Sequence, residues 1–139
     1  MIGLDHGSRR IGVAVGDDET GHAFPRPALL RKNLAADLER ISALASSEDT
    51  KRVVVGLPRN MDGSEGAQAR AARAFGAELA GIGLEVVFVD ERLTSWQARE
   101  QLTAAGRRPK RASGEKDSAA ACLILQEWLD LRRPNDSNA

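Results

Sequence analysis

The sequence predicts an α/β protein with one sheet of about five strands and helices on its faces. Strand-like and helix-like segments alternate along most of the 139 residues, as is typical of a layered domain. Two short apolar runs, residues 53–57 (VVVGL) and 84–89 (LEVVFV), have the composition of strands buried on both faces of a parallel sheet. We therefore expect one domain over residues 1–132, followed by a flexible tail over residues 133–139.

The first third of the chain is predicted to be antiparallel. Residues 1–5 and 11–15 are strand-like, and a Gly-Ser-Arg-Arg turn joins them into a hairpin. Pro25 and Pro27 lack ladder donors, so the strand over residues 23–30 can only be an edge strand or an irregular one. Asn33 is the predicted N-cap of a helix that ends near residue 47. Its apolar positions recur at helical spacing: Leu34, Leu38, Ile41 and Leu44.

The remaining segments follow a β-α-β order with right-handed crossovers. After the strand at 53–57 and a loop over 57–66, a second amphipathic helix is predicted, followed by the strand at 84–89. Thr94 and Gln97 form a capping box for a further helix that Gly106 can close. A last helix runs from about residue 115 and stops before Pro134. The positions predicted to mark the second helix are Gln68, Ala71, Phe75, Leu79 and Ile82.

Composition narrows the class of protein. The 20 basic and 20 acidic residues cancel, so any attraction for nucleic acid must be local. The chain starts without a signal-peptide pattern, and no apolar run approaches the roughly 18 residues of a membrane span. Cys122 is the only cysteine and is predicted to be a small buried hydrophobe. These features predict a cytoplasmic protein without membrane contact.

Acidic residues from three distant segments are predicted to meet at one edge of the sheet. Asp5 ends the first strand, Asp90 and Glu91 end the last strand, and Asp117 lies near the start of the last helix. In open α/β sheets, sites form outside the carboxyl ends of the parallel strands. Hydrolysis of a phosphodiester uses such a cluster, because Mg²⁺ or Mn²⁺ prefers oxygen ligands. Two such ions roughly 4 Å apart can activate water and stabilise the leaving oxygen.

Each acid also has a purely structural interpretation. Asp5 would cap the turn, Glu91 would pair with Arg92, and Asp117 would complement the dipole of the last helix. Taken together these interpretations are weaker, because the topology brings all three segments to one edge independently of any function.

Other acidic and histidine side chains are weaker candidates. Residues 17–19 and Asp62 lie in glycine-containing turns, where a solvated acid is the better interpretation. His6 and His22 lack a metal-binding spacing, so we expect surface or supporting roles for both.

Four ordered motifs resemble one known family. They are residues 5–15 (DHGSRRIGVAV), 53–66 (VVVGLPRNMDGSEG), 90–95 (DERLTS) and 116–125 (KDSAAACLIL, with a trailing EWL). In this order and nearly this spacing they resemble the YqgF (RuvX) family, a bacterial branch of the ribonuclease H-like superfamily that also includes the RuvC resolvases. The resemblance covers residues 1 to about 131.

The resemblance implies a ribonuclease H-like fold, a five-stranded mixed sheet of order 3-2-1-4-5. The family is described as Holliday-junction resolvases and as nucleases that mature the 5′ end of the small-subunit ribosomal RNA precursor. Asp5, Glu91 and Asp117 fall on its metal-binding acids, which makes them the predicted catalytic residues and ligands of Mg²⁺ or Mn²⁺. Its basic motif positions fall on Arg10, Arg92 and Lys116.

One departure from the wider superfamily favours Glu91 over Asp90 as the ligand. Relatives carry an acid on the fourth strand or the helix after it, whereas here that strand ends Gly56-Leu57-Pro58. With order 3-2-1-4-5, the first and fifth strands are two spacings apart, roughly 9 to 10 Å. A longer glutamate that reaches over the side-chain-free Gly56 closes that gap.

A basic segment precedes Asp117. Residues 106–116 hold five cations against Glu115 alone, and their position favours phosphate contact over a merely solvated loop. The segment has no aromatic residue, which argues against base stacking. The predicted nucleic-acid contacts here are Arg107, Arg108, Lys110, Arg111 and Lys116.

The sequence leaves several functions open. A metal-dependent nuclease acting on structured RNA or branched DNA is the leading prediction, with precursor 16S ribosomal RNA favoured over a four-way junction. Symmetric junction cleavage would require a homodimer, which the sequence leaves open. The D-x-G-S-x-x-x-G opening also resembles the phosphate hairpin of the actin-like ATPases, but the chain is too short for their second domain. A non-cutting nucleic-acid-binding protein is the remaining alternative.

Overall fold

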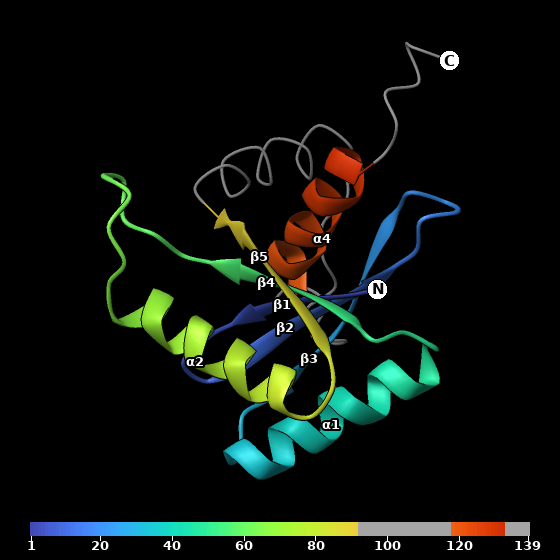
Figure 1. The fold of residues 1–139 in the computed structure, drawn as a ribbon, viewed down its shortest axis with the longest axis horizontal. Helices are drawn as coiled ribbons and strands as arrows, with labels where there is room; N and C mark the ends of the chain where they lie inside the picture. Colours follow the sequence, from blue (N-terminus) through green and yellow to red (C-terminus); the bar gives the residue numbers. More distant parts are fainter. Residues whose placement is uncertain (92–117, 133–139) are drawn as a thin grey trace.

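The computed structural model describes residues 1–91 and 118–132, which form one five-stranded sheet with helices on both faces (Figure 1). The predicted helix that Thr94 and Gln97 would open lies outside these residues, as do the basic segment and the tail over 133–139. In chain order the elements are β1 (Ile2–His6), β2 (Arg10–Gly16), β3 (Ala23–Leu30), α1 (Leu34–Ser47), β4 (Arg52–Leu57), α2 (Ala67–Gly81), β5 (Glu85–Asp90) and α4 (Ala119–Arg132).

The strand order β3-β2-β1-β4-β5 confirms the predicted sheet. β2 pairs antiparallel with β1 and β3, whereas β1, β4 and β5 are parallel. The arrowheads of β1, β4 and β5 therefore point to the same side in Figure 1, and we call this side the carboxyl edge. β1 starts and ends one residue later than predicted, so Asp5 lies inside the strand and pairs with Gly12.

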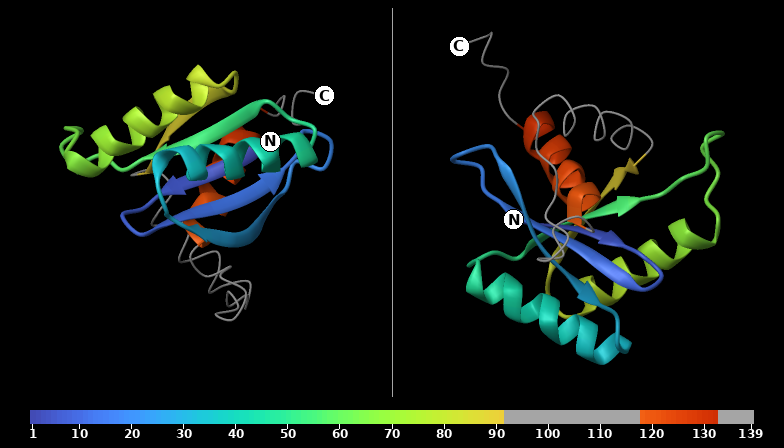
Figure 2. Two further views of the ribbon diagram at one scale, coloured as in Figure 1. Left: turned by 90° about the horizontal axis from the view of Figure 1, so that it is seen from below. Right: turned by 180° about the vertical axis from the view of Figure 1, so that it is seen from behind.

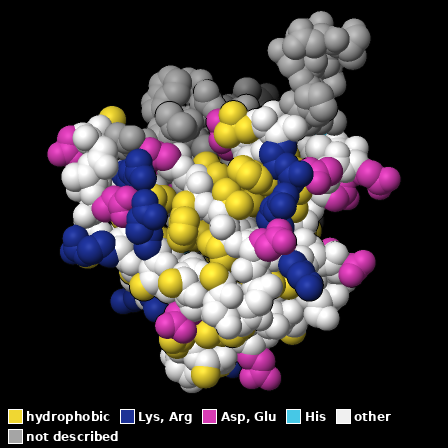
Figure 3. Space-filling view, viewed as in Figure 1, with side chains coloured by type: hydrophobic (Ala, Val, Ile, Leu, Met, Phe, Trp, Pro, Cys, Tyr) yellow, Lys and Arg dark blue, Asp and Glu magenta, His cyan; other side chains and the backbone are white. Residues whose placement is uncertain are grey.

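Each face of the sheet has its own core. α1 and α2 cover one face with Ile2, Leu4, Val53 and Val55 beneath them, while α4 covers the other face (Figure 2). α4 lies close to β1, because a Cβ atom added to Gly3 would be 2.7 Å from the Cβ of Leu125. In Figure 3, apolar side chains gather between β5 and α4, and acidic and basic side chains mix over the β4–α2 loop and α2.

The helix predictions hold in type but not in every buried position. Asn33 caps α1 as predicted, because its side-chain oxygen accepts a hydrogen bond from the backbone amide of Ala36 at 2.8 Å. In α2, Phe75 and Leu79 are buried as predicted. The other three predicted positions are exposed, and the buried face uses small residues instead: Ala69, Ala72 and Gly76.

Gly76 explains the rotated face of α2. A Cβ atom at this position would be 2.5 Å from the Cζ of Phe88, so the helix packs against β5 only where a side chain is missing. Periodicity of large apolar residues misses this arrangement, because close packing selects small side chains. Ile82, predicted to be on the buried face, is 46% exposed at the end of the helix.

A register shift in β2 anchors the start of α4. The pairing of β2 with β3 shifts between Ile11 and Val13, consistent with the irregular edge strand predicted from the prolines. The amide of Val13 donates to the hydroxyl oxygen of Ser118 at 3.0 Å, and both residues are buried. The start of α4 is thereby fixed beside Gly12, the strand partner of Asp5.

Further along α4, Cys122 is half-buried, and its thiol donates to the carbonyl of Ala23 at 3.4 Å. This contact fits the predicted packing role of the cysteine. Of the helices that the structure describes, none has the length and apolar character needed to span a membrane.

Ser118→Ala should lower the free energy of unfolding by about 1–3 kcal/mol, because it leaves the buried amide of Val13 without its acceptor. Urea denaturation of the substituted and parent proteins measures this loss. Ser47→Ala is the matched control, since the Ser47 hydroxyl bonds to the Leu44 carbonyl at an exposed helix end. Equal losses for the two substitutions would contradict the assigned role of Ser118.

Candidate active site

Asp5 and Glu91 lie on the same face of the sheet, at its carboxyl edge. Successive side chains of a strand alternate between the two faces. Gly3 approaches Leu125 of α4, so Asp5, two residues on, projects from the α4 face as well. Val89 belongs to the core beneath α4, and Glu91, two residues further, follows the same alternation. Both carboxylates therefore belong to the α4 side of the carboxyl edge.

Glycines occupy the sheet positions on both sides of Asp5. Gly12 is its partner in β2, and Gly56 follows Val55, the residue of β4 that pairs with Leu4. A Cβ atom added to Gly56 would lie 2.5 Å from Oε1 of Glu91. The glutamate side chain thus occupies the space above Gly56, as the strand spacing predicted.

The two carboxyl groups interact directly. A side-chain hydrogen bond joins Glu91 to Asp5, and this requires a shared proton in the absence of a cation. Burial, followed by the bond to Asp5 and the charges of Asp5 and Asp90, raises the pKa of Glu91 from 4.5 to about 8. The fold therefore holds two acids together against their mutual repulsion, which is a feature of functional sites.

Asp90 belongs to a different group of side chains. It is next to Glu91 in sequence, but alternation places it on the side of Phe88 and α2. Oδ2 of Asp90 lies 3.9 Å from Nη1 of Arg59, whose Nε lies 3.4 Å from Oε2 of Glu65. Sequence reasoning missed Arg59, because a cation in a loop after a strand has no distinctive pattern. This ion-pair chain accounts for Asp90 without a role at the acid pair.

Most of the other predicted site residues are outside the described part of the chain. Arg10 begins β2 at the carboxyl edge and is exposed. Ser118 directly follows Asp117 and is anchored at Val13, beside Asp5's partner Gly12. Those outside are Arg92, Arg107, Arg108, Lys110, Arg111, Lys116 and Asp117.

The described residues fit a divalent cation in chemistry. Carboxylate oxygens are the ligands that Mg²⁺ and Mn²⁺ prefer. A cation would offset both the burial and the neighbouring acidic charges that raise the pKa of Glu91. Gly12 and Gly56 leave the neighbouring sheet positions without side chains. Within residues 1–91 and 118–132, no three acids, histidines or cysteines converge as a ready metal cage. The pair therefore provides part of a ligand set.

The two histidines do not join the acid pair. The ring of His6 stacks on Phe75 with 4.7 Å between centroids, and burial, followed by the charge of Arg31, lowers its pKa. His22 is exposed in the turn between β2 and β3. The stacking of His6 agrees with a supporting role in packing α2 against β1.

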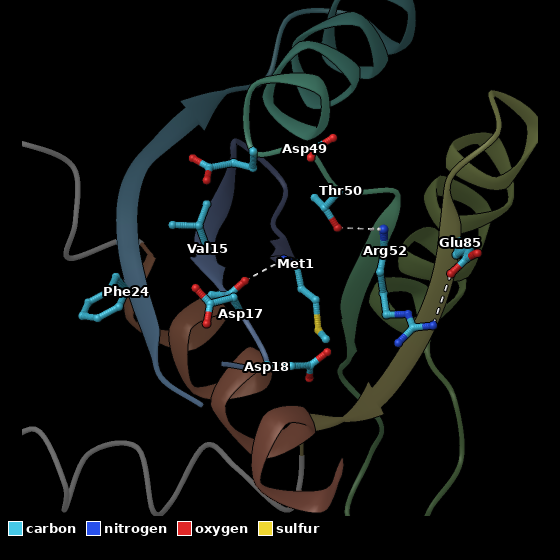
Figure 4. A pocket seen from close by; sticks show the side chains of 11 residues that line it. Met1, Val15, Asp17, Asp18, Phe24, Asp49, Thr50, Arg52 and Glu85 are labelled. Atoms are coloured by element: carbon cyan, nitrogen blue, oxygen red, sulfur yellow. Dashed lines mark hydrogen bonds and ion pairs between the residues drawn. The ribbon is translucent and has the colours of Figure 1, made fainter. Parts of the chain in front are cut away.

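A separate pocket of about 400 Å³ lies at the opposite end of the sheet (Figure 4). Met1 points into its centre, and Arg52 and Glu85 close one side with an ion pair of 3.3 Å. Asp5, Arg10 and Glu91, the predicted site residues within the described part of the chain, do not line this pocket. Five acidic residues line it: Asp17, Asp18, Glu48, Asp49 and Glu85.

Glu91→Gln should stabilise the metal-free protein at pH 8. A carboxyl with a raised folded-state pKa binds more protons when folded, so its contribution to the unfolding free energy falls as pH rises from about 5 to 8. Glutamine resembles the protonated form and removes this loss, leaving the variant more stable than the parent at pH 8 by about 1 kcal/mol or more. Urea titrations in a chelator measure the difference across this range.

Glu85→Gln, at the exposed start of β5, serves as the control and should leave the slope with pH unchanged. An identical pH dependence for the parent and Glu91→Gln would show that the acids are not coupled.

Known proteins are similar to this chain in sequence and in fold. The chain matches the family described as "RuvX: Holliday junction resolvase" over residues 1–131. A Synechococcus sp. protein named "Putative pre-16S rRNA nuclease" is 45% identical over 134 residues, covering 95% of this chain and 89% of that protein. An Anaeromyxobacter sp. (strain K) protein of the same name is 43% identical, covering 96% and 98%.

A solved structure shares the architecture. "T. thermophilus RuvC in complex with Holliday junction substrate" superposes with a TM-score of 0.55 and 15% identity, covering 94% of this chain and 93% of that one. This likeness confirms the predicted ribonuclease H-like fold with its five-stranded mixed sheet. By its match over residues 1–131 and by relatives at 43–45% identity, the chain belongs to the RuvX family.

Proposed function

We propose that this protein is a metal-dependent nuclease that hydrolyses phosphodiester bonds in structured nucleic acid. Maturation of the 5′ end of precursor 16S ribosomal RNA is the reaction we favour. The observation that carries the proposal is the half-buried Asp5–Glu91 pair, which lies on one face of the carboxyl edge, with Gly12 and Gly56 at the neighbouring strand positions. The names of the curated relatives support the choice of substrate.

Asp5, Glu91 and Asp117 would hold Mg²⁺ or Mn²⁺, with two ions as the expected number. Bound there, the ions supply an activated water and stabilise the charge that develops on the leaving oxygen. Because the pKa of Glu91 is raised, its carboxyl would have to lose a proton in order to act as a metal ligand beside Asp5. Binding of Mg²⁺ or Mn²⁺ at this edge should therefore release protons near neutral pH.

Residues around the acid pair would determine how a phosphodiester approaches it. Gly12 places no side chain beside Asp5, and Gly56 leaves the space that Glu91 fills, so a phosphodiester would meet the two carboxylates without a bulkier strand neighbour between them. Exposed Arg10 is positioned to contact a backbone phosphate. The basic side chains of residues 107–116, together with Arg92, are expected to neutralise further phosphates. Affinity would then be largely independent of base sequence.

Cleavage of a four-way DNA junction is the second candidate. The family to which the chain belongs is described as a Holliday junction resolvase, and the structurally similar RuvC binds a Holliday junction substrate, which favours this candidate. Symmetric cleavage would additionally require a homodimer. A third, non-enzymatic candidate is a protein that binds structured RNA or a junction without cutting it, which the coupled acid pair disfavours.

We expect cleavage of a 16S precursor 5′ leader in Mg²⁺ or Mn²⁺, and a slower reaction or none on a four-way junction. Parallel assays of both substrates, with Asp5→Asn as control, measure the preference. Faster cleavage of the junction would favour the second candidate, and binding without cleavage of either would favour the third.

Glu91→Gln should reduce metal-dependent cleavage by a factor of about 10² or more, because it removes a ligand from the α4 side of the edge. Asp90→Asn should retain much of the activity, since Asp90 faces Arg59 on the other side. Single-turnover rates at saturating Mn²⁺ separate the two variants. The opposite ranking would assign the ligand to Asp90.

A further inference from the structure

Five cations from three segments gather at one corner of the carboxyl edge. The segments are the β1–β2 turn, the end of β3 with the linker that follows, and the first half of α1. Sequence analysis singled out only Arg10 among these cations. We call this group the basic corner: Arg9, Arg10, Arg31, Lys32 and Arg40.

Hydrogen bonds donated by Arg31 join the linker after β3 to the β1–β2 turn. Its backbone amide donates to the carbonyl of Arg9 at 2.8 Å. Nη1 of Arg31 donates to the carbonyls of Gly7 and Ser8 at 3.1 and 3.3 Å. Arg10 pairs with Leu30 across β2 and β3. The backbone segments that carry these cations are therefore fixed relative to one another.

A buried acid fixes the third segment. Asp37 is only 2% exposed, accepts from the amide of Lys32 at 3.1 Å and pairs with Arg40. Arg40 also donates to the carbonyl of Leu30 at 2.7 Å. Glu39 lines a different hollow, together with Ser42 and Ile82. Five cations thus stand against one carboxylate, and that carboxylate is buried.

The basic corner adjoins the acid pair. Gly7 is two residues from Asp5, a separation of at most about 7 Å along extended chain. Between them, His6 is influenced by the charges of both Arg31 and Asp5. A strand of nucleic acid that crosses the carboxyl edge at Asp5 would therefore reach the β1–β2 turn, with Arg9 and Arg10, before the part of the corner that lies on the α1 face.

The opposite end of the sheet carries acidic and basic side chains together. Five carboxylates line the pocket of Figure 4, where Arg52 and the amino group of Met1 also lie. Arg26 and Arg132 pair with Glu48 and Asp18 there, and Lys51 adjoins Asp49 and Thr50. The cations at that end are therefore balanced by exposed or half-buried acids, whereas the carboxylate that pairs within the basic corner is buried.

We propose that the basic corner binds consecutive backbone phosphates of the substrate, on the side of the acid pair formed by β3 and α1. This inference rests on the proposed nuclease function. It extends that function by stating on which side of the acid pair the substrate backbone lies. Arginine and lysine without an interleaved aromatic favour phosphate contacts over base stacking. The corner would thus position a structured substrate by its backbone, without reading its sequence.

The test removes two cations that are safe to change. Arg9 and Lys32 are exposed, and their side chains have no ion pair with another residue of the described part of the chain. In Ca²⁺, Arg9→Gln/Lys32→Gln should raise the Kd for a labelled 16S leader stem-loop, and for a labelled four-way junction, about tenfold at 0.1 M salt. The slope of log Kd against log salt should shrink by about 1.8, or about 0.9 per lost phosphate contact. In Mg²⁺, KM should rise while kcat is retained.

Arg26→Gln/Lys51→Gln is the control with the same charge change: Lys51 precedes β4 at the opposite end of the sheet, and the Arg26 side chain pairs with Glu48 of the pocket in Figure 4. It should leave the salt slope unchanged. Equal effects of the two double variants, or weaker binding without a change in slope, would overturn the assignment of the corner while leaving the nuclease proposal intact. A parent protein that neither binds nor cuts either probe would overturn the nuclease proposal, and the corner with it.

Discussion

The structure depends on one unfavourable contact, the approach of Asp5 and Glu91 at the carboxyl edge of the sheet. The parallel pairing of β1, β4 and β5 brings both strand ends to this edge, and strand alternation puts both side chains on the α4 face. Gly56 provides the space that Glu91 fills. Burial and the charge of Asp5 raise the pKa of Glu91, so folding stores repulsion that a divalent cation can relieve. The packing of α4 and the anchoring of Ser118 both keep this edge in place.

The fold was largely predictable because its signals are local. Apolar strands, proline-containing β3 and the Asn33 cap each follow from short stretches of sequence, and the strand order followed from the family resemblance. The buried face of α2 was predicted wrongly in three of five positions, because Gly76 and two alanines pack there where large residues were expected. The exposure of Ile82 follows from the same rotation.

The proximity of Asp5 and Glu91 was predictable from the sequence, whereas their surroundings were less so. The approach of Glu91 over Gly56 followed from strand spacing, since sheets repeat at fixed distances. Arg59 and the basic corner depend on hydrogen bonds between segments far apart in sequence, such as Arg31 to the turn carbonyls. Such contacts leave no periodic signal. The gathering of five cations at one corner gives no pattern in the sequence for the same reason.

We propose above all that Asp5 and Glu91 together hold a catalytic cation. Anomalous diffraction from crystals grown with Mn²⁺ near pH 7.5 tests it most directly, because the signal locates the ion without any assay of activity. The account predicts a peak about 2 Å from a carboxylate oxygen of both residues. A peak at Asp90 and Arg59, or no peak at the carboxyl edge at saturating Mn²⁺, would contradict it.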